Sequence, residues 1–143
     1  MRVDDLPLEE LEDVVEDLAD IRHDLGKYLT LGARFLGPEP GVADLREALK
    51  GDLLRTARRA SGDETAWELW ARLRPDGLDT DPDVQKIDEG IQALAMADLE
   101  GDRTVLEAAA ACAVEVSQAT RNLHRRAAVR LAASARNEGA EHG

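Results

Sequence analysis

The sequence predicts an all-α protein, specifically an antiparallel up-down four-helix bundle with one short additional helix. Aromatic residues make up only 3% of the 143 residues, and runs of β-branched residues are nearly absent, which leaves little material for a sheet. Alanine, leucine, glutamate and arginine dominate, and all four favour helices. Apolar residues recur at helical spacing between short glycine- and proline-containing breaks. These observations together indicate successive helices that share one core.

The first predicted helix extends from about Pro7 to Leu36. Pro7 suits the first turn, where its missing N–H costs nothing, and the acidic residues after it suit the positive end of the helix dipole. The apolar residues follow a heptad, as in a helix that faces the core of a bundle. They are Leu11, Leu18, Leu25 and Gly32 at one heptad position and Val14, Ile21, Tyr28 and Phe35 at the other. The Gly-Pro-Glu-Pro-Gly segment at 37–41 ends this helix.

A second helix is predicted from Val42 to about Ala60, followed by a short third helix. The inward residues of the second helix are Val42, Leu45, Leu49, Leu53 and Leu54. Asp63 is expected to cap the third helix. That helix carries Trp67, Trp70 and Leu73. We expect the two tryptophans to cover the bundle, and the alternative is a partner-binding patch.

A loop at 74–82 leads to Asp81, the predicted N-cap of a fourth helix that begins at Pro82. The apolar residues of this helix are Val84, Ile87, Ile91, Leu94 and Leu99. Residues 100–102 separate it from a last helix, about Arg103 to Ala135, whose alanine-rich stretch 108–113 allows close approach of a neighbour. Residues 137–143 are expected to fray.

The length fits one domain, residues 1–143, since no repeat or long linker divides the chain. The first helix is acidic in its opening half and the last helix is basic in its closing half. In an antiparallel bundle those halves lie side by side. The charged residues are Glu9, Glu10, Glu12, Asp13, Glu16, Asp17 and Asp20 on the first helix and Arg121, Arg125, Arg126 and Arg130 on the last.

The charge balance argues against nucleic acid or anionic membrane as the main partner. The chain has 30 acidic and 18 basic residues and a formal net charge of −12, so it repels polyanions.

No apolar stretch is long enough for a membrane span, and the N-terminal residues lack the apolar core of a signal peptide. The single cysteine, Cys112, excludes a disulfide framework and favours a reducing, cytoplasmic location. We expect its thiol to be buried and inert.

One short motif bears on function: Arg22-His-Asp-Leu-Gly-Lys-Tyr-Leu29. His23 stands two residues after Ile21 and two before Leu25, both predicted core positions, so its imidazole should face water. An exposed imidazole beside a carboxylate suits nucleophilic chemistry at neutral pH. The candidate catalytic residues are therefore His23, Asp24 and Lys27.

Two further residues are candidates for binding a protein partner. Asp20 lies one helical turn before His23, and Gly26 leaves a gap about one turn from it. A glycine inside a helix costs roughly 1 kcal/mol relative to alanine, so its presence requires a reason. Close approach of a partner is one reason, and tight contact with the second helix is the other.

The motif resembles the phosphoacceptor helix of two-component signalling proteins. Sensor kinases and the sporulation phosphotransferase carry Arg-His-Asp-x-x-Asn-x-Leu there, and histidine-phosphotransfer domains carry His-x-Leu-Lys-Gly. The first pattern is matched by Arg22, His23, Asp24 and Leu29. The second is matched by His23 and Leu25, with the glycine and lysine in swapped order.

This resemblance implies that His23 accepts a phosphoryl group and that Asp24 assists its transfer. It implies a receiver-domain partner, which supplies Mg²⁺ and the acceptor aspartate, and a bacterial signalling setting. Lys27 stands where the kinases have asparagine, and the chain has no room for an ATPase domain. The implied role is therefore a phosphorelay intermediate or a docking adaptor rather than a kinase.

The motif is also similar to the His-Asp-x-Gly-Lys signature of the HD-domain metal phosphohydrolases, which His23-Asp-Leu-Gly-Lys27 matches at every fixed position. That resemblance implies that His23 and Asp24 bind metal together with an upstream histidine and a downstream aspartate. No histidine precedes His23, and the heptad turns His23 outward, whereas a metal site must converge inside the bundle. His124 is the one candidate for an additional ligand. We therefore predict no metal and no other cofactor.

Several alternatives stay open at this stage. The chain can be a non-catalytic interaction or structural bundle in which His23 is simply solvated, and the alanine-rich last helix can serve a homodimer. The arginines near His124 either grip a phosphate or complement the closing half of their own helix, and the second interpretation is favoured. The acidic cluster Asp76, Asp79, Asp81 and Asp83 lacks the glycine and glutamate of a calcium loop.

Overall fold

The computed structural model describes residues 1–27, 41–61 and 66–142, and within these ranges the chain is helical with no strand. The regular helices are α1 (Leu8–Ile21), α3 (Val42–Ser61), α4 (Ala66–Leu73), α5 (Pro82–Met96) and α6 (Arg103–His142). A 3₁₀ turn, Val3–Asp5, precedes α1, and a π-helical segment, Arg22–Lys27, follows it. The predicted all-α class is confirmed. None of the described helices is long and apolar enough to cross a membrane.

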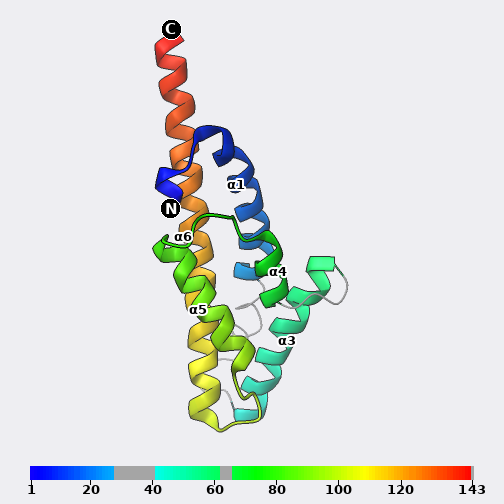
Figure 1. Cartoon of the computed structure of the whole chain (residues 1–143). Helices are drawn as coiled ribbons and strands as arrows, with labels where there is room; N and C mark the ends of the chain where they lie inside the picture. Colours follow the sequence, from blue (N-terminus) through cyan, green and yellow to red (C-terminus); the bar gives the residue numbers. More distant parts are fainter. Residues whose placement is uncertain (28–40, 62–65, 143) are drawn as a thin grey trace.

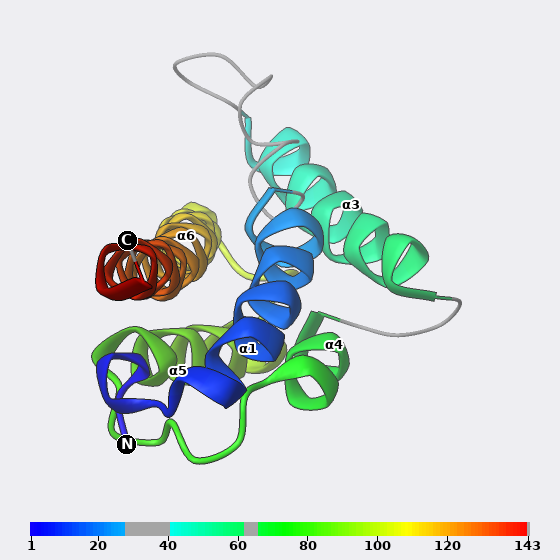
Figure 2. The ribbon, with the colours of Figure 1, turned by 90° about the horizontal axis from the view of Figure 1, so that it is seen from above.

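The four longer helices alternate in direction along the chain, and α4 is the short additional helix (Figure 1). Seen from above, α1 lies between α6 on one side and α3 on the other (Figure 2). Helices α5 and α6 form a hairpin closed by a turn at 97–102. The predicted helical bundle is therefore the observed architecture.

The core consists of the apolar faces that the helical periodicity predicts. In α1 and α5 the fully or almost fully buried residues are Leu11, Leu18, Ile21, Val84, Ile87, Ile91 and Leu94. Helix α6 adds Leu106, Ala109, Ala113, Val116, Ala119, Leu123 and Ala127. Val14 is half-buried, and the heptad positions from Tyr28 to Phe35 lie outside the described residues.

The first turn of the chain belongs to the core, which the sequence analysis missed. Val3 and Leu6 are buried, although the predicted first helix began only at Pro7. The 3₁₀ turn folds against α6, where the Arg130 guanidinium donates a hydrogen bond to the Val3 carbonyl at 3.0 Å. A chain start that is tied down in this way is part of the fold rather than a free end.

The prediction of one regular helix through the motif is wrong, because the backbone becomes π-helical at Arg22. In a π-helix each N–H bonds to the carbonyl five residues back, so the turn is wider than in an α-helix. Ile21 and Leu25 are both fully buried on either side of this change. Arg22 and His23, which directly follow the first of these anchors, are exposed.

Helices α3 and α4 cover one side of the bundle. Leu45 and Leu49 are buried as predicted, while the side chains of Leu53 and Leu54 lie outside the described part of the chain. Trp70 is buried, and its indole N–H donates to Asp88 Oδ1 at 2.6 Å. The predicted covering role is thus confirmed for Trp70. The side chain of Trp67 and the predicted cap Asp63 lie outside the described residues.

Helix α3 is also fixed to the α5–α6 turn. The Arg46 guanidinium donates to the Leu99 carbonyl at 2.6 Å and to the Gly101 carbonyl at 3.1 Å. Leu99, which was predicted within the fourth helix, lies beyond the end of α5 and is half-buried in this turn. Helix α6 extends to His142, past the predicted end near Ala135. Fraying of residues 137–143 stays a prediction.

Helices α5 and α6 approach closely at Gly90. A Cβ atom at this position would overlap the Cγ2 methyl of Val116. The half-buried thiol of Cys112 donates to the Gly90 carbonyl at 3.3 Å. Burial and the nearby Glu115 carboxylate raise the pKa of Cys112, which keeps the thiol protonated and weakly reactive. The alanine-rich stretch thus admits a close neighbour, as predicted.

We expect Gly90→Ala to lower the free energy of unfolding by about 1–3 kcal/mol, because the new methyl group forces α5 and α6 apart. Gly51→Ala is the matched control, since nothing lies within 4 Å of a Cβ there. It should instead stabilise α3 by about 0.5–1 kcal/mol. Urea unfolding measures both changes. If adding Val116→Ala does not recover part of the loss, the close approach is not its cause.

Candidate functional site

His23 lies at the surface, as the heptad predicted. Its side chain is exposed, whereas Ile21 and Leu25, two residues away on either side, are fully buried. Asp20, the predicted partner-binding residue one turn earlier, is exposed as well. The π-helical segment thus presents its histidine from a backbone with an apolar anchor on each side. Insertions of this helical type are frequent at functional sites.

Several members of the motif lie outside what the structure describes. The side chains of Asp24 and Lys27 and the surroundings of Gly26 lie outside the described part of the structure, and so does Leu29. Their predicted roles, with Asp24 and Lys27 in catalysis and Gly26 in partner binding, therefore stay predictions.

The π-helical segment and α6 together form a groove with a volume of about 640 Å³. Its polar lining residues are Arg22, Gln118, Arg121, Asn122, His124 and Arg125. Ala128 and Val129 supply an apolar end. We call this feature the cationic groove. The arginines near His124 were grouped from the sequence, but the contribution of Arg22 and of the remaining lining residues was missed, although 118, 121, 122, 125 and 129 share one face of a helix by their spacing.

Positive charge in the cationic groove is largely uncompensated. Burial and the positive charge of Arg22 lower the pKa of His124, so this imidazole is neutral at pH 7. Arg125 donates to Asn122 Oδ1 at 3.1 Å. Within residues 1–27, 41–61 and 66–142, the structure gives no ion pair within 4 Å to Arg22, Arg121 or Arg125.

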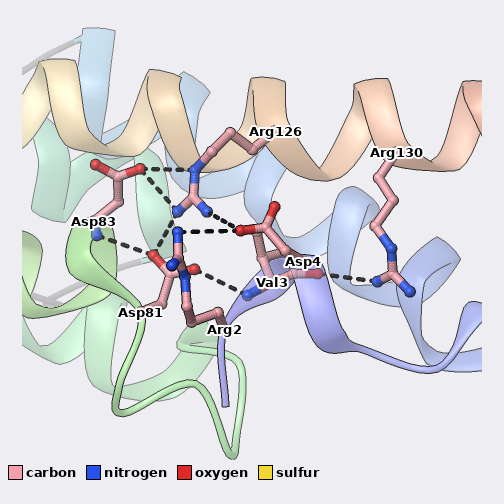
Figure 3. Close-up of polar contacts among 7 residues, drawn as sticks. All are labelled: Arg2, Val3, Asp4, Asp81, Asp83, Arg126 and Arg130. Atoms are coloured by element: carbon pink, nitrogen blue, oxygen red, sulfur yellow. Dashed lines mark hydrogen bonds and ion pairs between the residues drawn. The ribbon is translucent and has the colours of Figure 1, made fainter.

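Arg126, the next residue along α6, has the opposite environment (Figure 3). Its guanidinium contacts Asp81 Oδ1 at 2.5 Å, Asp83 Oδ2 at 2.9 Å and Asp4 Oδ2 at 3.1 Å. Asp81 is fully buried. It also accepts the Val3 N–H and the Asp83 N–H, each at 2.9 Å. We call Val3, Asp4, Asp81, Asp83 and Arg126 the Asp81 clasp.

Electrostatics in the Asp81 clasp favour the charged carboxylate. Burial by itself would raise the pKa of Asp81. The hydrogen bonds from Val3, Arg126 and Asp83 outweigh burial and lower that pKa below its ordinary value. In the clasp the Asp81 carboxylate is therefore charged and is stabilised by the Arg126 guanidinium and by two backbone N–H groups.

This arrangement extends the prediction for Asp81 and corrects the prediction for Arg126. Asp81 is an N-cap as predicted, but its burial and its bond to Arg126 were missed. Arg126 does not serve as a charge at its own helix end, because α6 continues to His142 and the dipole acts only within the last turn. Its partners come from the 3₁₀ turn and the start of α5 rather than from the acidic half of α1. No sequence pattern marks such contacts between distant elements.

No family model, no curated protein and no solved structure matches the chain. Among the side chains that the structure describes, no three histidine, cysteine or acidic residues are grouped so that they could hold a metal ion. His124, the candidate additional ligand, lines the cationic groove beside arginines.

We expect Asp81→Asn to lower the free energy of unfolding by about 3 kcal/mol near pH 7, since it leaves Arg126 without its closest carboxylate. The folded-state pKa of Asp81 is depressed, so the charge contributes fully above about pH 4 and the contribution is lost as the pH falls further. The difference between wild type and variant should therefore shrink in acid. Asp79→Asn, at an exposed carboxylate, is the control and should change stability by less than about 0.5 kcal/mol. Equal losses in both variants would contradict the role of the clasp.

We expect Arg22→Gln to raise the pKa of His124 toward its ordinary value of about 6.5, because a like charge is removed from the groove. NMR titration of the imidazole Cε1–H resonance measures this pKa. Arg103→Gln, near the start of the same helix, should leave it unchanged. An unaltered His124 titration in Arg22→Gln would show that the two groups are not neighbours in solution.

Proposed function

We propose that this protein is a small acidic signalling protein that presents His23 to a protein partner, either as a histidine-phosphotransfer-like component or as a docking adaptor. The observation that carries the proposal is the exposed His23 on a π-helical segment between the buried anchors Ile21 and Leu25. A partner can approach such a side chain directly, and the anchors limit the freedom of the backbone that bears it.

Phosphotransfer needs a nucleophilic nitrogen that another molecule can reach. In the proposed step an imidazole nitrogen of His23 attacks the phosphorus of a donor. The new P–N bond forms as the donor's bond to phosphorus breaks, the leaving group keeps the electron pair of that bond, and the imidazole N–H proton passes to the leaving group. The motif resemblance supplies the rest of the proposal. The partner is a receiver domain that brings Mg²⁺ and the acceptor aspartate, and Asp24 assists.

The setting is proposed on the same basis. A bacterial phosphorelay follows from the resemblance alone, and a cytoplasmic location from the single cysteine, Cys112. Docking without chemistry would use the same exposed surface around Asp20 and His23. An HD-type hydrolase is a second interpretation of the motif, and no contact among the described residues favours it.

Incubation with the small phosphodonor phosphoramidate tests the phosphotransfer reading. We expect acid-labile phosphohistidine at His23, formed at least tenfold faster in the folded protein than in a synthetic peptide of residues 18–30. His23→Ala should abolish this modification, while His124→Ala should leave it unchanged. Residue-resolved mass spectrometry at neutral pH and ³¹P NMR measure the product.

The outcomes separate the alternatives. A rate at His23 no greater than that of the peptide would contradict phosphotransfer, because the fold would then add nothing to the imidazole. A protein that keeps its partner binding in His23→Ala would contradict docking through this surface as well and favour the non-catalytic bundle.

A further inference from the structure

Positive charge gathers at one place in a molecule whose formal net charge is −12. The cationic groove takes Arg22 from the π-helical segment and Arg121 and Arg125 from α6. Both views show the chain leading into the π-helical segment at the end of α1, beside the middle of α6 (Figures 1 and 2). The tertiary fold thus places Arg22 in the same groove as Arg121 and Arg125.

Repulsion between like charges makes this arrangement of side chains unfavourable in the absence of an anion. Arg121 and Arg125 stand four residues apart on a helix, a spacing at which like charges destabilise each other. Arg22 also disfavours the charged form of His124 across the groove. Several other arginines among the described residues are compensated: Arg126 contacts three carboxylates, Arg74 contacts two, and Arg103 pairs with Glu107. Uncompensated cations that converge on a cavity are typical of a site for an anion.

The chemistry of the lining selects the kind of anion. Guanidinium groups present parallel N–H donors that match the oxygens of a phosphate, and amide side chains such as Asn122 add neutral donors. A volume of about 640 Å³ lies within the range of small-molecule sites. Ala128 and Val129 offer apolar contact next to the charges. A long polyanion is disfavoured because the molecule as a whole carries a formal net charge of −12.

We propose that the cationic groove binds the phosphate group of a small, soluble phosphate ester through Arg22, Arg121 and Arg125. This site goes beyond the function proposed for His23, because His23 is not among the residues that line the groove. The apolar end at Val129 would contact the organic part of the ester.

Titration of the ¹⁵N-labelled protein with inorganic phosphate and with glycerol 3-phosphate tests the proposal, with sodium chloride at equal ionic strength as the blank. We expect saturable shifts at residues 22 and 118–129 and tighter binding of the ester. The double variant Arg121→Gln/Arg125→Gln should bind both probes at least tenfold more weakly. Both arginines are exposed and repel each other, so the variant should fold at least as well as wild type. Arg103→Gln is the control and should bind like wild type.

A probe concentration of about 50 mM is roughly a hundredfold above the Kd of a weak phosphate site. Absence of saturation at this concentration would overturn the proposal. Equal affinities in wild type and the double variant would overturn it as well. Binding to phosphatidic-acid vesicles without any response to the soluble probes would also overturn it, since it would assign the phosphate to a lipid surface. His23→Ala should retain the shifts in the groove, so failure of the phosphotransfer proposal is distinguishable from failure of this one.

Discussion

The buried carboxylate of Asp81 is the interaction on which the arrangement of the other elements depends. It accepts hydrogen bonds from Val3 at the chain start, from Asp83 at the start of α5 and from Arg126 in the middle of α6. A charge without solvent contact is stable only with such partners. Each partner comes from a different part of the fold, so one side chain fixes the axial position of all three (Figure 3).

The clasp has a direct effect on the neighbouring surface. Arg125 and Arg126 are adjacent in sequence, yet one faces the cationic groove and the other faces carboxylates. With Arg126 turned toward the carboxylates and the apolar face of α6 in the core, Arg121 and Arg125 line the groove beside the π-helical segment. Arg126 is therefore paired with carboxylates, whereas Arg121 and Arg125 form a positively charged surface on a molecule whose net charge is negative.

Helical periodicity made the core predictable. Leu11, Leu18, Ile87 and Ile91 are buried because side chains at such spacings share a helix face whatever the partner is. The N-cap at Asp81 and the exposure of His23 also follow from local pattern. The π-helical segment does not, because it depends on how Ile21 and Leu25 meet other helices. The clasp and the groove depend on how α6 is rotated relative to residues 2–22. Local sequence patterns do not determine this rotation.

The span of the clasp along the chain has a consequence for folding. Its contacts join residues that are 78 positions apart between Val3 and Asp81 and 45 apart between Asp81 and Arg126. Closing such loops costs entropy before any contact forms, so we expect the clasp to form late in folding. Amide protons near a chain end usually exchange rapidly with solvent. The Val3 N–H is instead bonded to the buried Asp81 carboxylate, so its exchange requires the 3₁₀ turn to leave that carboxylate, and we expect Val3 to report opening of the clasp.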